Sequence, residues 1–295
     1  MAIQHFFTAQ STDSALALLA EHGESALITA GSTDVMVALR SGNISSKKTC
    51  LIDISRIAAL SFIRKNGKWI EIGSGTTHAL VSADPLIRSS SLILGEASHS
   101  VGSPQIRNRA TIGGNIITAA QCADTIPALL ALDAELVLRD TKGTERILPI
   151  RDFFPSAKKT AIRHDELLIS IRYAPLDDSG WKGSYYKLIR RAAVAKSRLN
   201  FATLVRLSPK GLIEEARISI GSTIPAPGRF GPAEEVLCGK KPSTGLVDEA
   251  ATACVDFIIK KAGKRWSSEY KEPVVRNVMK RELGKVLGLE GNHAE

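Results

Sequence analysis

Two short glycine segments constrain this 295-residue chain more than any other feature of its sequence. The first, Thr29-Ala30-Gly31-Ser32-Thr33-Asp34, lies between an apolar run ending at Ile28 and an apolar-periodic stretch beginning at Val35. The second is Thr111-Ile112-Gly113-Gly114-Asn115. Glycine lets a backbone approach a ligand closely, and successive N–H groups form anion-binding concavities. We expect two such loops to clamp a diphosphate; the alternative is a pair of ordinary turns, where glycine is also common.

Composition and charge narrow the class of protein. The chain is 44% hydrophobic and 23% charged, so it can bury a core in each of two domains. Its formal net charge of +9 favours an anionic partner, such as nucleic acid, a phosphate cofactor or an acidic protein surface. The basic residues form only short pairs, such as Lys47-Lys48 and Lys260-Lys261, without interleaved aromatic residues. Nucleic-acid binding is therefore a minor hypothesis.

The cysteines and the amino-terminal segment indicate the compartment. Cys50, Cys122, Cys238 and Cys254 are far apart and form no CxxC pair, so we expect reduced thiols and no zinc or iron–sulfur site. The first residues lack a basic segment followed by an apolar stretch, and no apolar run approaches the ~18 residues of a membrane span. These features predict a cytoplasmic, soluble protein.

Short helix-like and strand-like patterns alternate along the chain and predict an α+β fold. Helical spacing is expected over 12–22, 128–132, 245–261 and 269–287, and hairpins over 62–72 and 135–148. Further strands are expected near 51–54, 185–188, 201–205 and 216–221. The segment Gly73-Ser74-Gly75-Thr76-Thr77-His78 lacks the third glycine of G-x-G-x-x-G, so we reject a Rossmann fingerprint there.

A polar stretch over 173–180 that contains proline and glycine interrupts these patterns. We place the domain boundary there. The predicted domains are 1–176, with subdomains of about 1–60 and 61–176, and 181–288.

Three segments together carry a family resemblance. They are Ala30-Gly31-Ser32-Thr33-Asp34, then Gln105-Ile106-Arg107-Asn108 leading into the second glycine segment, then Ala123-Asp124-Thr125 before Pro127-Ala128-Leu129-Leu130. In this order they resemble the FAD-binding medium subunit of the molybdenum hydroxylases, the xanthine dehydrogenase and carbon monoxide dehydrogenase group. The resemblance extends through 187–220 to Arg265-Trp266-Ser267-Ser268-Glu269-Tyr270. It implies a two-subdomain FAD-binding domain of the PCMH/vanillyl-alcohol-oxidase type, followed by a carbon monoxide dehydrogenase flavoprotein-like C-terminal α+β domain.

The resemblance also implies a non-covalent FAD between the two subdomains, partly covered by the C-terminal domain. Asp124 would lie near the adenosine end, Leu168 near the isoalloxazine ring, and Lys187 near the pyrimidine end of the flavin, where a cation raises the flavin potential. Ile112 would lie against the flavin or shield its path to the neighbouring cluster. From the residues alone, Asp124 could instead cap a helix, Leu168 could be core, and Lys187 a solvated strand-edge lysine. The full predicted set is Ile28, Thr29, Ala30, Gly31, Ser32, Thr33, Asp34, Val35, Thr111, Ile112, Gly113, Gly114, Asn115, Thr118, Asp124, Leu168 and Lys187.

The sequence departs from the family pattern in three places. Ser32 stands where the family often has glycine, which narrows backbone freedom but adds a hydroxyl; we expect FAD binding to survive. Ala120-Gln121-Cys122 replaces a more usual Ser-Pro stretch, so the detailed shape of that loop does not follow from the family pattern. The cysteine-rich iron–sulfur insertion of some relatives is absent from the sequence.

The function that the resemblance implies is electron transfer. The chain would take electrons from [2Fe–2S] clusters of a small partner subunit and pass them through FAD to an acceptor, while a large molybdopterin subunit performs the hydroxylation. No catalytic acid–base residue is then expected in this chain, and the complex would be a dimer of heterotrimers. Two alternatives remain open: a free-standing FAD oxidase or dehydrogenase acting on its own substrate, and a basic binding module without redox function.

Overall fold

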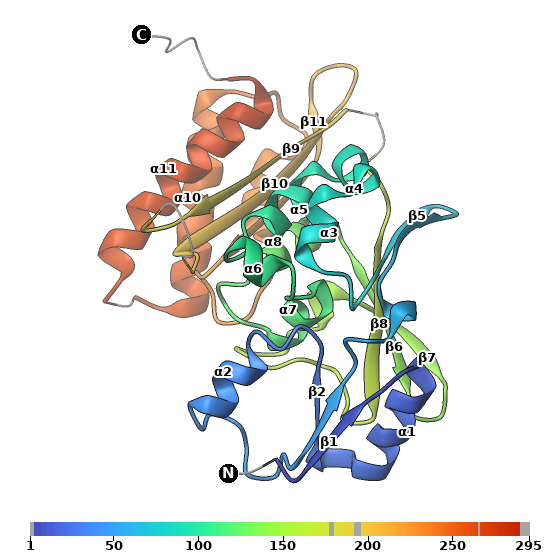
Figure 1. The fold of residues 1–295 in the computed structure, drawn as a ribbon. Helices are drawn as coiled ribbons and strands as arrows, with labels where there is room; N and C mark the ends of the chain where they lie inside the picture. The colour runs from blue at the N-terminus through green and yellow to red at the C-terminus, as the bar shows by residue number, and fades with distance from the viewer. Residues whose placement is uncertain (1–2, 177–179, 192–195, 265, 290–295) are drawn as a thin grey trace.

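The computed structural model describes residues 3–176, 180–191, 196–264 and 266–289, and in these residues it has three β-sheets with helices packed around them (Figure 1). The fold mixes helices and strands as predicted. The predicted boundary region includes residues 177–179, which lie outside the described residues, as does Arg265 of the last family segment.

The first sheet is small and parallel, with strand order β1-β3-β2. Its strands are β1 (His5–Thr8), β2 (Ala26–Thr29) and β3 (Cys50–Asp53). Helix α1 (Thr12–His22) begins at a capping box in which Ser14 N donates to Ser11 Oγ at 3.1 Å. It buries Leu16 and Leu19 in a cluster with Ile52. The predicted helix over 12–22 is confirmed, and its packing holds β2 in position ahead of the first glycine segment.

The second sheet has five strands in the order β4-β5-β8-β6-β7, and all neighbours are antiparallel. Its strands are β4 (Ile63–Asn66), β5 (Trp69–Gly73), β6 (Glu135–Asp140), β7 (Glu145–Pro149) and β8 (Glu166–Tyr173). Both predicted hairpins are present. Because β5 is antiparallel to both of its neighbours, it is not part of a parallel βαβ unit, which agrees with the rejected Rossmann fingerprint.

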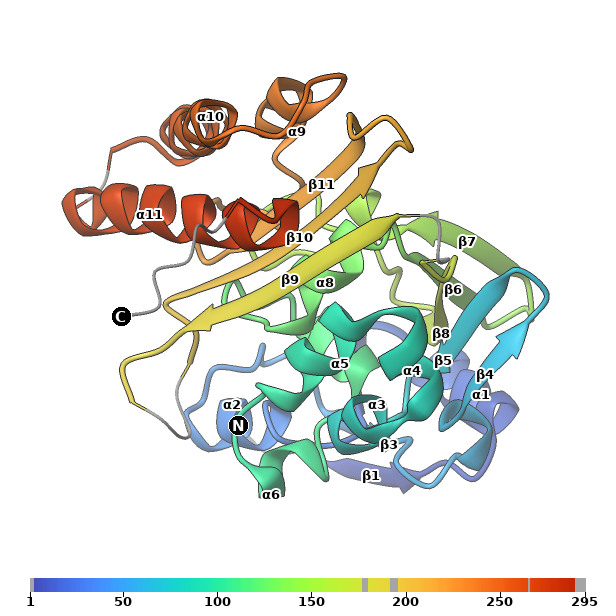
Figure 2. The same ribbon diagram turned by 90° about the horizontal axis from the view of Figure 1, so that it is seen from above.

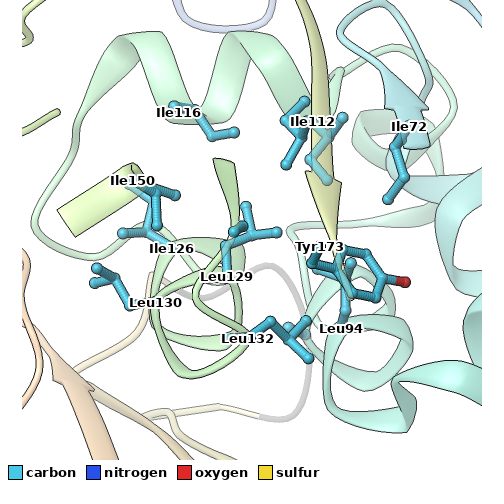
Figure 3. Packing of buried hydrophobic residues seen from close by; sticks show 14 of the residues in the cluster. Ile72, Leu94, Ile112, Ile116, Ile126, Leu129, Leu130, Leu132, Ile150 and Tyr173 are labelled. Atoms are coloured by element: carbon cyan, nitrogen blue, oxygen red, sulfur yellow. The ribbon is translucent and has the colours of Figure 1, made fainter. Parts of the chain in front are cut away.

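A layer of short helices lies between the five-stranded sheet and the C-terminal sheet (Figure 1). These are α3 (His78–Ala83), α4 (Pro85–Ser90), α5 (Leu92–His99), α6 (Pro104–Arg107), α7 (Ile112–Thr118) and α8 (Thr125–Ala131). Their apolar side chains form one core with β5 and β8, in which Ile72, Ile112, Leu129 and Tyr173 lie close together (Figure 3). The Tyr173 hydroxyl is hydrogen-bonded to Ser91 Oγ at 2.7 Å inside this core.

The C-terminal sheet is an antiparallel meander in the order β11-β10-β9. Its elements are β9 (Trp181–Leu188), β10 (Leu199–Leu207), β11 (Ile213–Gly221), α9 (Gly231–Leu237), α10 (Thr244–Ala262) and α11 (Ser268–Leu287). The last three helices cover one face, and α5 and α8 lie against the other (Figure 2). The C-terminal sheet is therefore packed directly against the layer of short helices that includes the second glycine segment.

Candidate functional site

A cavity of about 550 Å³ lies between the first sheet and the five-stranded sheet, beside α7. Its walls are β2, the first glycine segment with the start of α2 (Val35–Arg40), the start of α7, and residues 162–168, which lead into β8. This volume is within the range of roughly 300–1,000 Å³ that is usual for sites of small molecules and cofactors.

The first glycine segment is a loop between β2 and α2, as predicted, and it lines the cavity. No described residue accepts a hydrogen bond from the backbone N–H groups of Gly31 to Asp34. Ser32 has a φ of 63°, in the left-handed region, and its hydroxyl is 2.9 Å from Thr29 Oγ1. The loop thus offers a row of free backbone donors, which is the arrangement that binds anions.

The second glycine segment is not a loop, and the structure corrects that interpretation. Thr111 is the N-cap of α7, and the glycines lie in the first turn of the helix. Their N–H groups already have partners: Gly113 N donates to Ser74 O at 2.9 Å, and Gly114 N donates to Thr111 Oγ1 at 3.1 Å. Ile112 N donates to Thr76 O at 3.0 Å. The predicted second row of free N–H groups is therefore absent from this segment, because capping and the contact with 74–76 use them.

Gly31, Gly113 and Gly114 differ in what a side chain at each position would meet. A Cβ on Gly31 would overlap the carbonyl group of Arg109, and a Cβ on Gly113 would lie 2.6 Å from Ser74 O. Both glycines are therefore required by close backbone packing. A Cβ on Gly114 would meet only Thr111 Oγ1, at 3.0 Å, and Gly114 lines the cavity. Of the three, Gly114 is the glycine at which a Cβ would be least obstructed by the protein itself.

Two side-chain hydrogen bonds fix α7 against its surroundings. Thr118 Oγ1 donates to Asp34 Oδ2 at 3.3 Å and so joins the end of α7 to the first glycine segment. Thr125 Oγ1 donates to Asn115 Oδ1 at 2.8 Å and joins α7 to α8. The first of these bonds brings together two segments that are 84 residues apart in the chain.

Charged and polar residues that the sequence analysis did not assign to the site also line the cavity. Lys48 Nζ donates to Ala26 O at 2.6 Å, and burial lowers the pKa of Lys48 in spite of the nearby Glu24. Burial alone would raise the pKa of Glu166, but hydrogen bonds from Arg146 and from the backbone of Arg163 outweigh burial and lower it. The Lys47-Lys48 pair was visible in the sequence, but nothing in its spacing connects it with the glycine segments.

All but three of the predicted cofactor contacts line the cavity. Leu168 does so while also belonging to the core. Ile112 is fully buried in the core instead. Asp124 and Lys187 also lie outside the lining. The contacts of all these residues with a flavin stay predictions.

Asp124 and Lys187 form a buried ion pair across the two parts of the chain, with 2.8 Å between Oδ2 and Nζ. Their side chains are 9% and 8% exposed, so Lys187 is not the solvated strand-edge lysine of the alternative interpretation. Lys187 Nζ also donates to Ser100 O at 2.7 Å, and Asp124 accepts further hydrogen bonds from Ser197 Oγ and Asn200 Nδ2. Asp124 occupies the N-cap position of α8 but makes no capping hydrogen bond. The pair therefore neutralises itself at the contact between the C-terminal sheet and α8.

A cofactor-sized cavity with free backbone donors on one wall is the type of site that suits an anionic cofactor. Comparison with protein families identifies the class: residues 2–173 match the FAD binding domain in molybdopterin dehydrogenase, and residues 184–286 match the CO dehydrogenase flavoprotein C-terminal domain. The chain belongs to this family of FAD-binding dehydrogenase subunits, and it is the oxidoreductase subunit that the sequence motifs predicted.

Relatives cover the chain almost completely. The nicotinate dehydrogenase FAD-subunit of Eubacterium barkeri is 30% identical over 97% of both chains. The putative xanthine dehydrogenase FAD-binding subunit XdhB of Escherichia coli K12 is 28% identical over 94% of both. A solved structure of carbon monoxide dehydrogenase from Hydrogenophaga pseudoflava matches with a TM-score of 0.89 at 27% identity, covering 96% of this chain and 97% of that one.

Within the part of the chain that the structure describes, no helix is both long enough and apolar enough to cross a bilayer.

Proposed function

We propose that this chain is the electron-transfer subunit of a molybdenum-containing hydroxylase, taking electrons from [2Fe–2S] clusters of a partner and passing them through FAD to an acceptor. The observation that carries the proposal is the row of free N–H groups from Gly31 to Asp34 on the wall of a 550 Å³ cavity in a FAD-binding domain. FAD supplies the conversion between single-electron and two-electron transfer.

The residues around the cavity fit a dinucleotide. The free donors of the first glycine segment suit a diphosphate, which carries negative charge and several acceptor oxygens. Gly114 leaves open space at the start of α7, where any larger side chain would reduce the cavity. Non-covalent binding is supported by residues 28–35, which contain neither histidine nor cysteine for attachment to the flavin.

The proposal extends to partners, domains and compartment. The relatives include medium chains of multi-subunit enzymes, so we assign to this chain a small [2Fe–2S] subunit and a large molybdopterin subunit in a dimer of heterotrimers. The domain limits 1–176 and 181–288 are part of the proposal and are close to the two family matches. A cytoplasmic location agrees with four cysteines that are too scattered to form a disulfide framework.

The test begins with the absorption spectrum of the purified chain before and after acid precipitation, with chromatography of any released flavin. FAD in the supernatant is the expected result. A colourless chain that also fails to bind added FAD contradicts the proposal. Flavin that stays with the pellet indicates a covalent oxidase instead. Substrate turnover by the isolated chain would favour the free-standing oxidase or dehydrogenase.

A pair of variants ties the flavin to the cavity. Gly114→Val is expected to be purified without FAD, because its branched side chain fills the open side of the first turn of α7. Cys122→Ala is the control and is expected to keep FAD, since Cys122 lies outside the cavity lining. Full flavin content in Gly114→Val contradicts the assignment of the cavity.

A further inference from the structure

Ser74 is held rigidly where the end of β5 meets α7. Its backbone N–H donates to Ile169 O of β8 at 2.9 Å, and its carbonyl accepts from Gly113 N of α7 at 2.9 Å. A Cβ on Gly113 would lie 2.7 Å from the Cβ of Ser74, so the two residues are in direct contact. The position of the Ser74 side chain is therefore set by backbone bonds to two different elements.

The Ser74 hydroxyl lacks a partner although it is buried. Ser74 is 5% exposed, and within the described residues its Oγ has no hydrogen-bond partner. Ser74 also lines the cavity. A buried hydroxyl without a partner costs stability, and when its residue lines a cavity that cost would be offset if a ligand accepted its hydrogen bond.

The neighbours of Ser74 indicate which part of a dinucleotide it meets. It touches the first turn of α7, and the first glycine segment reaches the same region because Gly31 packs on Arg109 and Ala110, immediately before α7. The free N–H groups of Gly31 to Asp34 and Ser74, whose hydroxyl has no partner in the described residues, thus come from the two subdomains, and both segments line one cavity. Donors from two sides suit an anion whose oxygens point in several directions, which describes a diphosphate better than a flavin ring.

We propose that Ser74 is a further binding residue of the site and that its hydroxyl donates a hydrogen bond to the diphosphate of the bound dinucleotide. This inference rests on the proposed function, because it takes FAD as the ligand. It adds a second donor group to the free N–H groups of the first glycine segment, from the Gly-Ser-Gly stretch at the end of β5.

The test is Ser74→Ala in the full chain, stripped of flavin and titrated with FAD and, separately, with ADP. The variant removes only Oγ and keeps the Cβ that contacts Gly113. Loss of a hydrogen bond to a charged group should raise the Kd of both ligands about tenfold. The Tm of the flavin-free chain should stay the same or rise, because a buried hydroxyl without a partner has been removed.

Ser98→Ala is the matched control. Ser98 lies in α5, is fully buried, and has an Oγ that is likewise without a partner in the described residues, but it does not line the cavity. Its replacement should move the Tm in the same direction as Ser74→Ala and leave both Kd values unchanged.

The possible outcomes separate the inference from the proposed function. An unchanged Kd for ADP in Ser74→Ala overturns the diphosphate assignment, even if FAD binds more weakly. Equal losses of affinity in Ser74→Ala and Ser98→Ala also overturn it, because the effect would then come from the core. If the unaltered chain binds neither FAD nor ADP, the proposed function itself has failed.

Discussion

The two glycine segments have similar compositions but different structures. The first is a loop whose N–H groups from Gly31 to Asp34 have no partner in the described residues. The second is the capped first turn of α7, where the N–H groups of Gly113 and Gly114 are already bonded. A glycine-rich segment thus indicates close backbone approach, but only the hydrogen bonds show whether the approach serves a ligand or the protein itself.

The first prediction is that Gly31→Ala destabilises the chain most. Its Cβ would overlap the carbonyl group of Arg109, so the first glycine segment must move away from the segment before α7. We expect a loss of about 3 kcal/mol in the free energy of unfolding, measured by urea denaturation of the flavin-free chain. A variant as stable as the unaltered protein would contradict the close contact between the two segments.

Gly113→Ala should have the next largest effect. The added Cβ would lie 2.6 Å from Ser74 O and would strain the contact between α7 and the end of β5. We expect a loss of about 2 kcal/mol in the same urea experiment. Gly114→Ala, one residue further along α7, is the control: its Cβ meets only Thr111 Oγ1, so its stability should change by less than about 1 kcal/mol. Equal losses at the two positions would remove the distinction drawn between these glycines.

Gly114→Ala should weaken cofactor binding more than Gly113→Ala does, although it costs less stability. Gly114→Ala places a methyl group at the cavity wall and is expected to weaken FAD binding about tenfold, or about 1.4 kcal/mol, while the fold is retained. Fluorescence titration of the flavin-free chain measures this change. Unaltered affinity in Gly114→Ala would mean that the open side of Gly114 does not face the cofactor.

The sequence predicted elements whose pattern is long or punctuated by clear turns. The helix over 12–22, the two long C-terminal helices and both hairpins are confirmed. Helices α3 to α7 were missed because each has only four to eight residues, too few for helical periodicity to show. These helices are held by caps such as Thr77 and Asp84, and by the core that they share.

The lining of the candidate site was predictable where it is continuous in the chain and hidden where tertiary packing assembles it. Residues 28–35 line the cavity as one stretch. Ser74, Lys48 and the residues before β8 reach the cavity only because sheets that are distant in sequence meet there. The pairing of Asp124 with Lys187 was equally invisible, since their separation of 63 residues spans two parts of the chain.

The smallest predicted effect concerns Ser32, the left-handed residue of the first glycine segment. Its φ of 63° favours glycine, whereas its hydroxyl is hydrogen-bonded to Thr29 Oγ1. Ser32→Gly relieves the backbone strain but loses this bond, so the free energy of unfolding should change by less than about 1 kcal/mol, and FAD should still bind.

Ser32→Ala separates the two contributions. It loses the same hydrogen bond but keeps a Cβ in the left-handed conformation, so it should be less stable than Ser32→Gly by about 1 kcal/mol in urea denaturation. The difference between the two variants then measures the backbone strain that this segment tolerates while its N–H groups stay free. If Ser32→Ala is as stable as Ser32→Gly, the loop does not hold its left-handed turn in solution, and the contrast with the capped second segment would lose its structural basis.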